Sequence, residues 1–184
     1  DREEIVVVCR GMSADYLENR ASGETILNRC DQVILVNDWG HHGLPKYISK
    51  SDKKVINFLA RMHERKARLP NAIRVDSVLK TPHRAKIKDL NISRFFDMMW
   101  DTGDTGLMAI AYASIVGKRV LIVGLDFWEA AYWTPRGRGK HEDERKRPKG
   151  LTRKTRFMSA FITYMKAHTG CLFQIYTKSP TLKD

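Results

Sequence analysis

Polar residues flank the most apolar segments of the chain, at positions where their side chains could meet one ligand. Thr105 and Gly106 begin the apolar run "TGLMAIAYASIVG", and Asp126, Phe127 and Trp128 follow the apolar run "KRVLIV". A carboxylate can hold a ribose hydroxyl, aromatic rings can stack on a base or sugar, and glycine lets a ligand approach the backbone. The structural alternative is an ordinary helix cap at Thr105, a turn capped by Asp126 and aromatic rings in the core.

A second polar segment, "CRGMS", follows the first apolar run "EEIVVVC" and contains Arg10, Gly11 and Ser13. Gly11 permits a tight turn, and Ser13 is placed to cap a short helix whose backbone N–H groups would suit a phosphate. The segment is neither a dinucleotide fingerprint nor a Walker A loop, so a plain strand-to-helix turn is the alternative.

Histidines suggest two further kinds of chemistry. The segment "NDWGHH" contains Asp38, His41 and His42, but their spacing matches no closed set of metal ligands, so we predict no metal site and loop histidines instead. His141 lies beside Glu142 in a basic segment and is a candidate general base for deprotonating a sugar hydroxyl. The alternative for His141 is a surface residue without a catalytic role.

Alternating apolar runs and helix-like segments predict the elements that position these side chains. We expect a short helix after Ser13, strands over 3–9, 30–38, 118–124 and 171–177, a strand or strand-to-helix passage over 53–61, a weaker strand over 71–80, and helices over 105–117 and 153–170. Gly117 and Gly170 are the expected ends of the last two helices. This order predicts one Rossmann-like α/β domain over residues 1–184, with a mostly parallel sheet flanked by helices. Residues that follow the strands, Asn37, Asp38 and Asn57 among them, would then lie at the ligand-binding edge.

Composition limits the class of protein. The chain has 184 residues, of which 42% are hydrophobic and 29% charged, as is typical of a soluble globular domain. We expect no transmembrane helix and no signal peptide, because no apolar run reaches about 18 residues and "DREEIVVVC" lacks a basic start. Cys9, Cys30 and Cys171 are expected to be reduced core thiols of a cytoplasmic protein.

Positive charge is concentrated in one segment. The net charge is +12, and the 22 residues from 135 to 156 carry ten Lys or Arg against three Asp or Glu. Such a field attracts phosphate on a nucleotide, a nucleic acid or an anionic membrane. Its glycine-rich start and Pro148 predict a mobile, lid-like loop at about 135–152, and a solvated surface is the alternative. Aromatic residues do not alternate with the basic ones, which makes nucleic acid the less favoured partner.

Together these motifs resemble the bacterial sialyltransferases of glycosyltransferase family 42. The Gly-Asn-Gly-Pro-Ser turn of that family resembles "CRGMS", and its Arg-Cys-Asn-Gln segment resembles "NRCDQ", with Asp31 in place of a nucleotide-contacting Asn. Asn57 in "KKVINF" is placed like another Asn of the family. The closest resemblance is between its Thr-Ser-Gly helix start, helix, strand and Gly-Ile-Asp-Phe-Tyr end and "DTGLMAIAYASIVGKRVLIVGLDFW".

The resemblance implies a variant GT-A fold and an inverting, metal-independent transferase. Its donor would be a sugar activated by cytidine monophosphate (CMP), its acceptor a glycan, and it would need no cofactor. The family has a lid over the donor, a His base after the lid and Tyr residues near the donor phosphate. By this resemblance Trp128 would replace one such Tyr, and Tyr132 would supply another. The implied donor-binding residues are Arg10, Gly11, Ser13, Asp31, Asn57, Thr105, Gly106, Asp126, Phe127, Trp128 and Tyr132, with His141 as the catalytic base.

The sequence departs from the family at four places. Arg10 and Asp31 stand where the family has Asn, Thr102 stands where it has Arg, and "KGLTRK", near Thr152, occupies the spacing of its His. Two other functions therefore stay open. Archaeal-type pterin diphosphokinases, which use a nucleoside triphosphate and magnesium, share a similar glycine turn and Gly-x-Asp pattern. A basic nucleic-acid-binding module is the other. Peripheral membrane contact through the basic loop and a homo-oligomer are further expectations.

Overall fold

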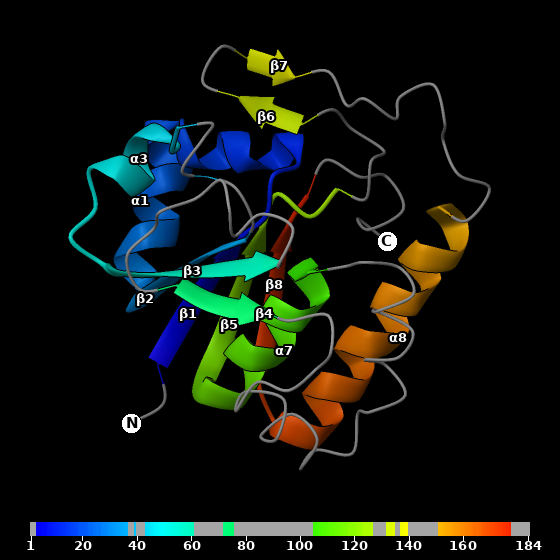
Figure 1. Cartoon of the computed structure of the whole chain (residues 1–184). Helices are drawn as coiled ribbons and strands as arrows, with labels where there is room; N and C mark the ends of the chain where they lie inside the picture. The colour runs from blue at the N-terminus through cyan, green and yellow to red at the C-terminus, as the bar shows by residue number, and fades with distance from the viewer. Residues whose placement is uncertain are drawn as a thin grey trace.

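A parallel β-sheet is the centre of the computed structural model, which describes residues 3–36, 39, 43–60, 72–75, 105–126, 132–134, 137–139 and 151–177 (Figure 1). Six strands form this sheet in the order β4-β3-β2-β1-β5-β8, and every neighbouring pair is parallel. The predicted α/β fold is confirmed. The strands are β1 (Glu3–Val8), β2 (Gln32–Val36), β3 (Lys54–Ala60), β4 (Ala72–Val75), β5 (Gly117–Val123) and β8 (Leu172–Tyr176).

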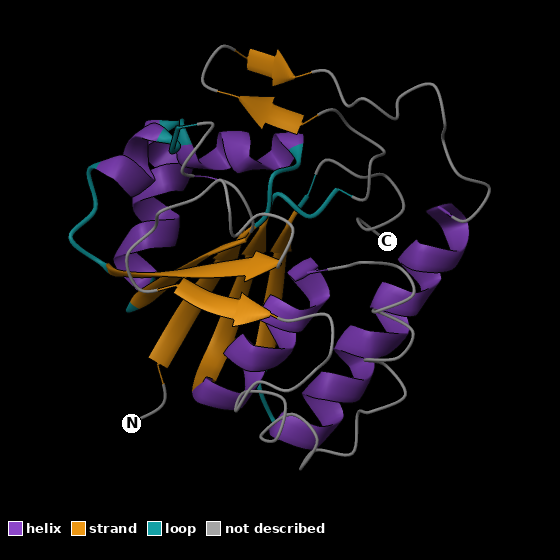
Figure 2. Cartoon of the chain, in the orientation of Figure 1, coloured by secondary structure: helices purple, strands orange, loops and turns teal. Residues whose placement is uncertain are grey.

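Helices cover both faces of the sheet, as Figure 2 shows. One face carries the 3₁₀ helix η1 (Met12–Leu17), α1 (Arg20–Arg29) and α3 (Lys46–Ser49). The other face carries α7 (Thr105–Val116) and α8 (Leu151–Thr169). A separate antiparallel hairpin, formed by β6 (Tyr132–Thr134) and β7 (Gly137–Gly139), lies at the top of the view in Figure 1.

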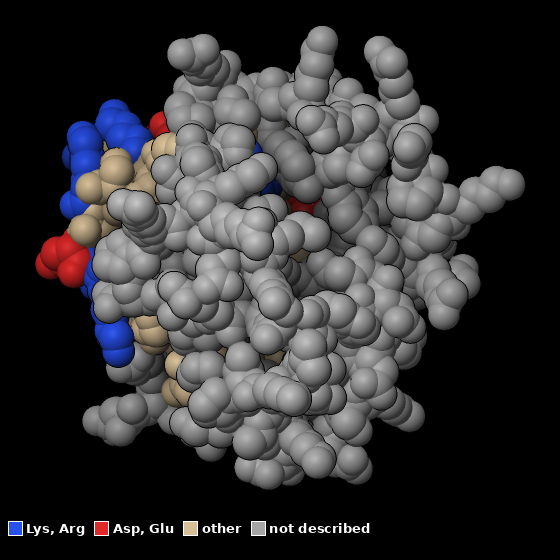
Figure 3. All heavy atoms as spheres, in the orientation of Figure 1, with Lys and Arg blue, Asp and Glu red and all other residues tan. Residues whose placement is uncertain are grey.

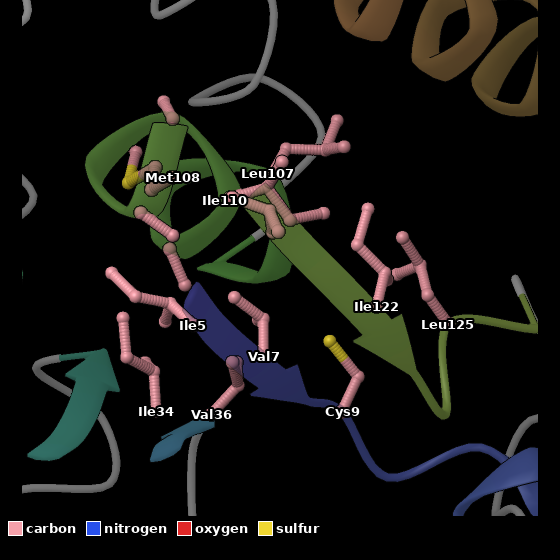
Figure 4. Close-up of a cluster of buried hydrophobic side chains, with 14 of the residues drawn as sticks. Ile5, Val7, Cys9, Ile34, Val36, Leu107, Met108, Ile110, Ile122 and Leu125 are labelled. Atoms are coloured by element: carbon pink, nitrogen blue, oxygen red, sulfur yellow. The ribbon is translucent and has the colours of Figure 1, made fainter. Parts of the chain in front are cut away.

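The central strands are continuous runs of branched apolar residues because both of their faces are buried. Along β1, alternate side chains enter opposite cores. Ile5 and Val7 pack toward α7, whereas Val6 and Val8 pack toward η1 and α1. Figure 4 shows Ile5, Val7, Ile34 and Ile122 on the α7 side, facing Leu107 and Ile110 of that helix. All five residues of β2 are buried, as expected for an interior parallel strand.

The α7–β5 segment confirms the predicted helix and strand. α7 has no polar stripe because it lies between the sheet and α8, and a helix apolar on all sides is a buried helix. It ends at Val116, and Gly117 already begins β5, one residue earlier than predicted. At the end of α8, Gly170 has φ of 65° and donates its N–H to the Lys166 carbonyl, so its expected role is confirmed.

The remaining expectations on the fold vary in outcome. The third apolar segment is a strand through Ala60, and the fourth is a strand of four residues. Cys9, Cys30 and Cys171 are all buried, as predicted. Within the described part of the chain, no helix combines the length and apolarity needed to cross a membrane.

Candidate functional site

The strand order places the candidate site at the carboxyl ends of β1 and β5. From β1 the chain continues to β2, β3 and β4 on one side, whereas β5 and β8 lie on the other. The order therefore reverses between β1 and β5, and ligands of open α/β sheets bind outside the carboxyl ends of the strands at such a reversal. The two loops that meet there are the β1 loop, residues 9–13, and the β5 exit, residues 124–126.

Hydrogen bonds join these two loops directly. The Gly11 N–H donates to the Gly124 carbonyl (2.7 Å), and the Gly124 N–H donates to Ser13 Oγ (2.8 Å). The Ser13 N–H donates to Asp126 Oδ2 (2.7 Å). We call Gly11, Ser13, Gly124 and Asp126 the β1–β5 clasp. The structure thus brings together three predicted site residues from segments more than 100 positions apart.

Asp126 is the centre of the clasp and is only 2% exposed. Its second oxygen, Oδ1, accepts a hydrogen bond from the Thr177 hydroxyl (2.8 Å), and Thr177 directly follows β8. A buried carboxylate needs such donors to offset its lost hydration. The geometry is therefore that of the structural alternative, in which Asp126 caps a turn. Its contact with a ribose hydroxyl stays a prediction. Sequence reasoning missed Thr177, although its place after an apolar strand was a usable signal.

The clasp leaves no room for a side chain at either of its two glycines. A Cβ on Gly11 would overlap Asp126 and the Gly124 carbonyl. Gly124 has φ of 79°, and a Cβ there would overlap the Cys9 carbonyl. The β1 loop and the β5 exit can approach this closely only because neither residue has a side chain.

The prediction that Ser13 caps a helix is wrong. η1 begins after Gly11, has no side-chain cap, and its Ser13 hydroxyl is used by Gly124 instead. The N–H groups of Gly11, Ser13 and Ala14 all donate within the protein, the last to the Gly11 carbonyl (3.0 Å). The clasp and the turn of η1 already use these three N–H groups, and the expected phosphate contact at this turn stays a prediction.

Two tryptophans hold Arg10 at this edge. The Trp133 N–H donates to the Arg10 carbonyl (2.9 Å), and Trp39 Nε1 donates to the Val8 carbonyl (3.1 Å). The Arg10 Cζ lies 5.9 Å from the Trp39 ring centroid, within the range of a cation–π contact. The two indole rings are 5.6 Å apart, and both residues are buried. Neither tryptophan was identified from the sequence, where "NDWGHH" was considered for its histidines.

Trp133 also attaches the β6–β7 hairpin to this edge of the sheet. β6 contacts η1, and the hairpin lies beyond the carboxyl end of β1 in Figure 1. Tyr132, predicted to contact the donor, begins β6 and pairs with Gly139 of β7. The hairpin therefore places the start of the predicted basic loop beside the candidate site. Most of that loop, residues 140–150, lies outside the described residues.

Asp31 is not part of this site. Its N–H donates to the Glu4 carbonyl (2.7 Å), and its Oδ2 accepts the Glu4 N–H (2.8 Å). Asp31 precedes β2, so it lies at the amino-terminal edge of the sheet, opposite the β1–β5 clasp. The prediction that it shares the donor site is wrong, because the strand begins after residue 31 and not before it.

Asn57 lies within β3, so its expected place after a strand is wrong, although the predicted segment 53–61 contains it. It pairs in register with Leu35, which pairs with Val8, so Asn57 is level with the end of β1 while β3 continues to Ala60. Thr105 begins α7, as predicted, and Gly106 is buried in its first turn. Since α7 leads into the amino end of β5, its own first turn lies toward the carboxyl edge of the sheet.

Several predicted residues lie outside the described part: Phe127, Trp128, His141 and the candidate metal ligands Asp38, His41 and His42. In the described part, no group of three or more His, Cys, Asp or Glu is placed to hold a metal ion. Basic side chains of the described residues gather over α1 and α3 in Figure 3, where Arg20, Arg29, Lys46 and Lys50 are exposed.

Comparisons with known proteins give one informative likeness. No protein-family model matches the chain, and no curated protein matches it significantly. Among solved structures, a point variant of the sialyltransferase CST-II in complex with CMP is similar, with a TM-score of 0.50 and 11% identity. The similarity covers 98% of this chain and 84% of that one. At this identity the likeness shows the fold alone: the chain has a Rossmann-like α/β architecture.

Proposed function

We propose that the protein is a glycosyltransferase that takes a sugar from a CMP-activated donor and gives it to a glycan acceptor. The observation that carries the proposal is the β1–β5 clasp. Its hydrogen bonds fix the two loops at the strand-order reversal relative to each other. In its support, the fold is similar along almost its whole length to a sialyltransferase that was solved with CMP. Membership of the same glycosyltransferase family is part of the proposal.

The described residues would form a rigid surface against which the donor binds. The clasp fixes the backbone on either side of the reversal, and the fully buried Trp39 supports it from within the core. The first turn of α7 lies toward the same edge, where its positive end would favour the anionic leaving group. Thr105 and Gly106 would contact the donor there. Asn57, Phe127, Trp128 and Tyr132 remain proposed donor contacts.

The proposed reaction is a direct displacement. The acceptor hydroxyl attacks the anomeric carbon, the bond from that carbon to the phosphate oxygen breaks, and CMP leaves with the electron pair. A base takes the hydroxyl proton, and His141 is the proposed base. No metal or other cofactor takes part in this scheme. The basic segment would act as a lid, with peripheral contact to a membrane that carries the acceptor, and the protein would form a homo-oligomer.

Thermal unfolding in the presence of nucleotides tests the donor class. CMP should raise the melting temperature without magnesium, by several degrees at about 100 times its Kd for a domain of this size. UMP and AMP should raise it less at the same concentration. A shift with ATP that requires magnesium would support a diphosphokinase instead. Binding to an oligonucleotide that weakens steeply with salt would support a nucleic-acid-binding module.

A matched pair of variants on α7 tests the proposed edge. Thr105→Ala should weaken CMP binding, because Thr105 is in the first turn of the helix. Ser114→Ala is its control, since the Ser114 hydroxyl donates to the Ala111 carbonyl within the same helix, two turns away. Donor turnover, followed as release of CMP, should fall in the first variant and not in the second. Equal turnover in both would contradict the proposed role of this helix start.

A further inference from the structure

A CMP-linked donor carries a negative phosphate, and the protein must supply positive charge or N–H donors to hold it. In the β1 loop and the first turn of η1, the N–H groups of Gly11, Ser13 and Ala14 already donate within the protein. Both carboxyl oxygens of the clasp residue Asp126 accept hydrogen bonds from the protein, so this residue offers no donor to a phosphate. A basic side chain after β1 would supply positive charge on the β1 side of this edge, in addition to the positive end of α7.

Arg10 is placed for that purpose. It directly follows β1 at the strand-order reversal and precedes the clasp residue Gly11. Its carbonyl is held by the Trp133 N–H, and its guanidinium lies over the Trp39 ring. Both ends of the residue are thus held by buried aromatic residues. The planar fork of a guanidinium can pair with two phosphate oxygens.

From this placement we infer that Arg10 is the phosphate-binding residue of the site, and that its ligand is a nucleoside monophosphate. The inference rests on the proposed function and deepens it. The Arg10 side chain takes over the role that backbone N–H groups at a helix start perform in other nucleotide-binding folds. The contact with the Trp39 ring restricts the rotamers of a long side chain before the ligand arrives, which lowers the entropic cost of binding.

The test compares CMP with cytidine, which differs only by the phosphate, on wild type, Arg10→Gln, Arg10→Lys and Arg29→Gln. Arg29 is an exposed arginine at the end of α1, next to the opposite edge of the sheet, and provides the same chemical change away from the site. Isothermal titration calorimetry measures both affinities. Circular dichroism and thermal unfolding show whether each variant is folded.

The expected result is a selective loss. Arg10→Gln should weaken CMP binding by about tenfold to a hundredfold, the range for a charge-assisted pair, and leave cytidine binding unchanged. Arg10→Lys should lose less, because it keeps the charge but not the planar fork. Arg29→Gln should match wild type for both ligands. Cytidine binding by Arg10→Gln would also show that this variant keeps the nucleoside site.

Two results would overturn the inference, and they separate its failure from that of the proposed function. If wild type binds CMP and both Arg10 variants bind it equally well, Arg10 does not hold the phosphate, while the proposed donor class stands. If wild type binds neither CMP nor cytidine, the proposed function fails and the inference fails with it. If the Arg10→Gln variant does not fold, Arg10→Lys decides: an unchanged ratio of CMP to cytidine affinity would overturn the inference, and a reduced one would support it.

Discussion

Asp126 accepts a hydrogen bond of 2.7 Å from the Ser13 N–H, which lies 113 residues earlier in the chain. The bond connects the β1 loop to the β5 exit, on the two sides of the strand-order reversal. It forms only when β1 and β5 are paired, because neither loop is near the other in sequence. The candidate ligand edge is therefore a product of the assembled sheet, and its geometry should be as stable as the sheet itself.

Removing the Asp126 carboxylate should destabilise the protein strongly. Asp126→Ala leaves the Ser13 N–H and the Thr177 hydroxyl buried without their acceptor, at a cost of about 3 kcal/mol. Asp126→Asn keeps one acceptor and should cost about 1 kcal/mol. Urea unfolding measures both. Asp52→Asn, at an exposed loop position, is the control and should stay within about 0.5 kcal/mol of wild type. Equal stability of Asp126→Ala and the control would contradict a structural clasp.

Two glycines with positive φ should respond differently to alanine. Gly124 has φ of 79° and its Cβ would overlap the Cys9 carbonyl, whereas Gly170 has φ of 65° and open space around it. Gly170→Ala should therefore cost only the left-handed strain, about 1 kcal/mol. Gly124→Ala adds a backbone clash and should cost at least about 3 kcal/mol. Thermal unfolding of the two variants compares them. A similar melting temperature for both would show that the two loops can separate freely.

The sheet could be predicted from the sequence because its strands are continuous branched apolar runs. The apolar residues of "EEIVVVC", "QVILV" and "KRVLIV" are buried on both faces of the sheet, and periodicity detects such strands without tertiary information. Asp31 and Asn57 were misplaced because strand ends are weakly encoded. A shift of a few residues in the start of a strand moves a side chain to the opposite edge of the sheet.

The clasp could be predicted only in part. Gly11, Ser13 and Asp126 were identified by their positions after strands, but as separate ligand contacts. Their mutual hydrogen bonds depend on β1 and β5 being neighbours, and no local pattern encodes that pairing. Trp39 and Trp133 were missed for the same reason, since their contact joins a residue after β2 to the hairpin.

The packing of the Trp133 side chain should hold the β6–β7 hairpin against the edge of the sheet. It is 2% exposed, lies beside Trp39, and bonds the Arg10 carbonyl through its backbone. Trp133→Ala removes the packing but not the backbone bond, and should free the hairpin with a cost of about 3 kcal/mol. Limited trypsin digestion should then cut after Arg138 several times faster than in wild type. Trp133→Phe, which keeps an aromatic ring, should show an intermediate rate. An unchanged rate in both variants would mean that the hairpin is held by other contacts.

Cys30 should make stability fall at alkaline pH. Burial raises the pKa of its thiol from 9.0 to about 11, although nearby Lys53 acts in the opposite direction. The raised pKa means that the unfolded chain loses this proton first as pH rises. The thiol's contribution is therefore complete below pH 9 and is lost between pH 9 and about 11. Cys30→Ala removes the titration, so the free energy of unfolding of wild type relative to this variant should fall by about 2 kcal/mol over that interval. Urea unfolding at pH 8, 9, 10 and 11 measures the difference, in which the other titrating groups cancel because both proteins share them. A difference that stays constant from pH 8 to 11 would show that the Cys30 thiol reaches solvent in the folded protein.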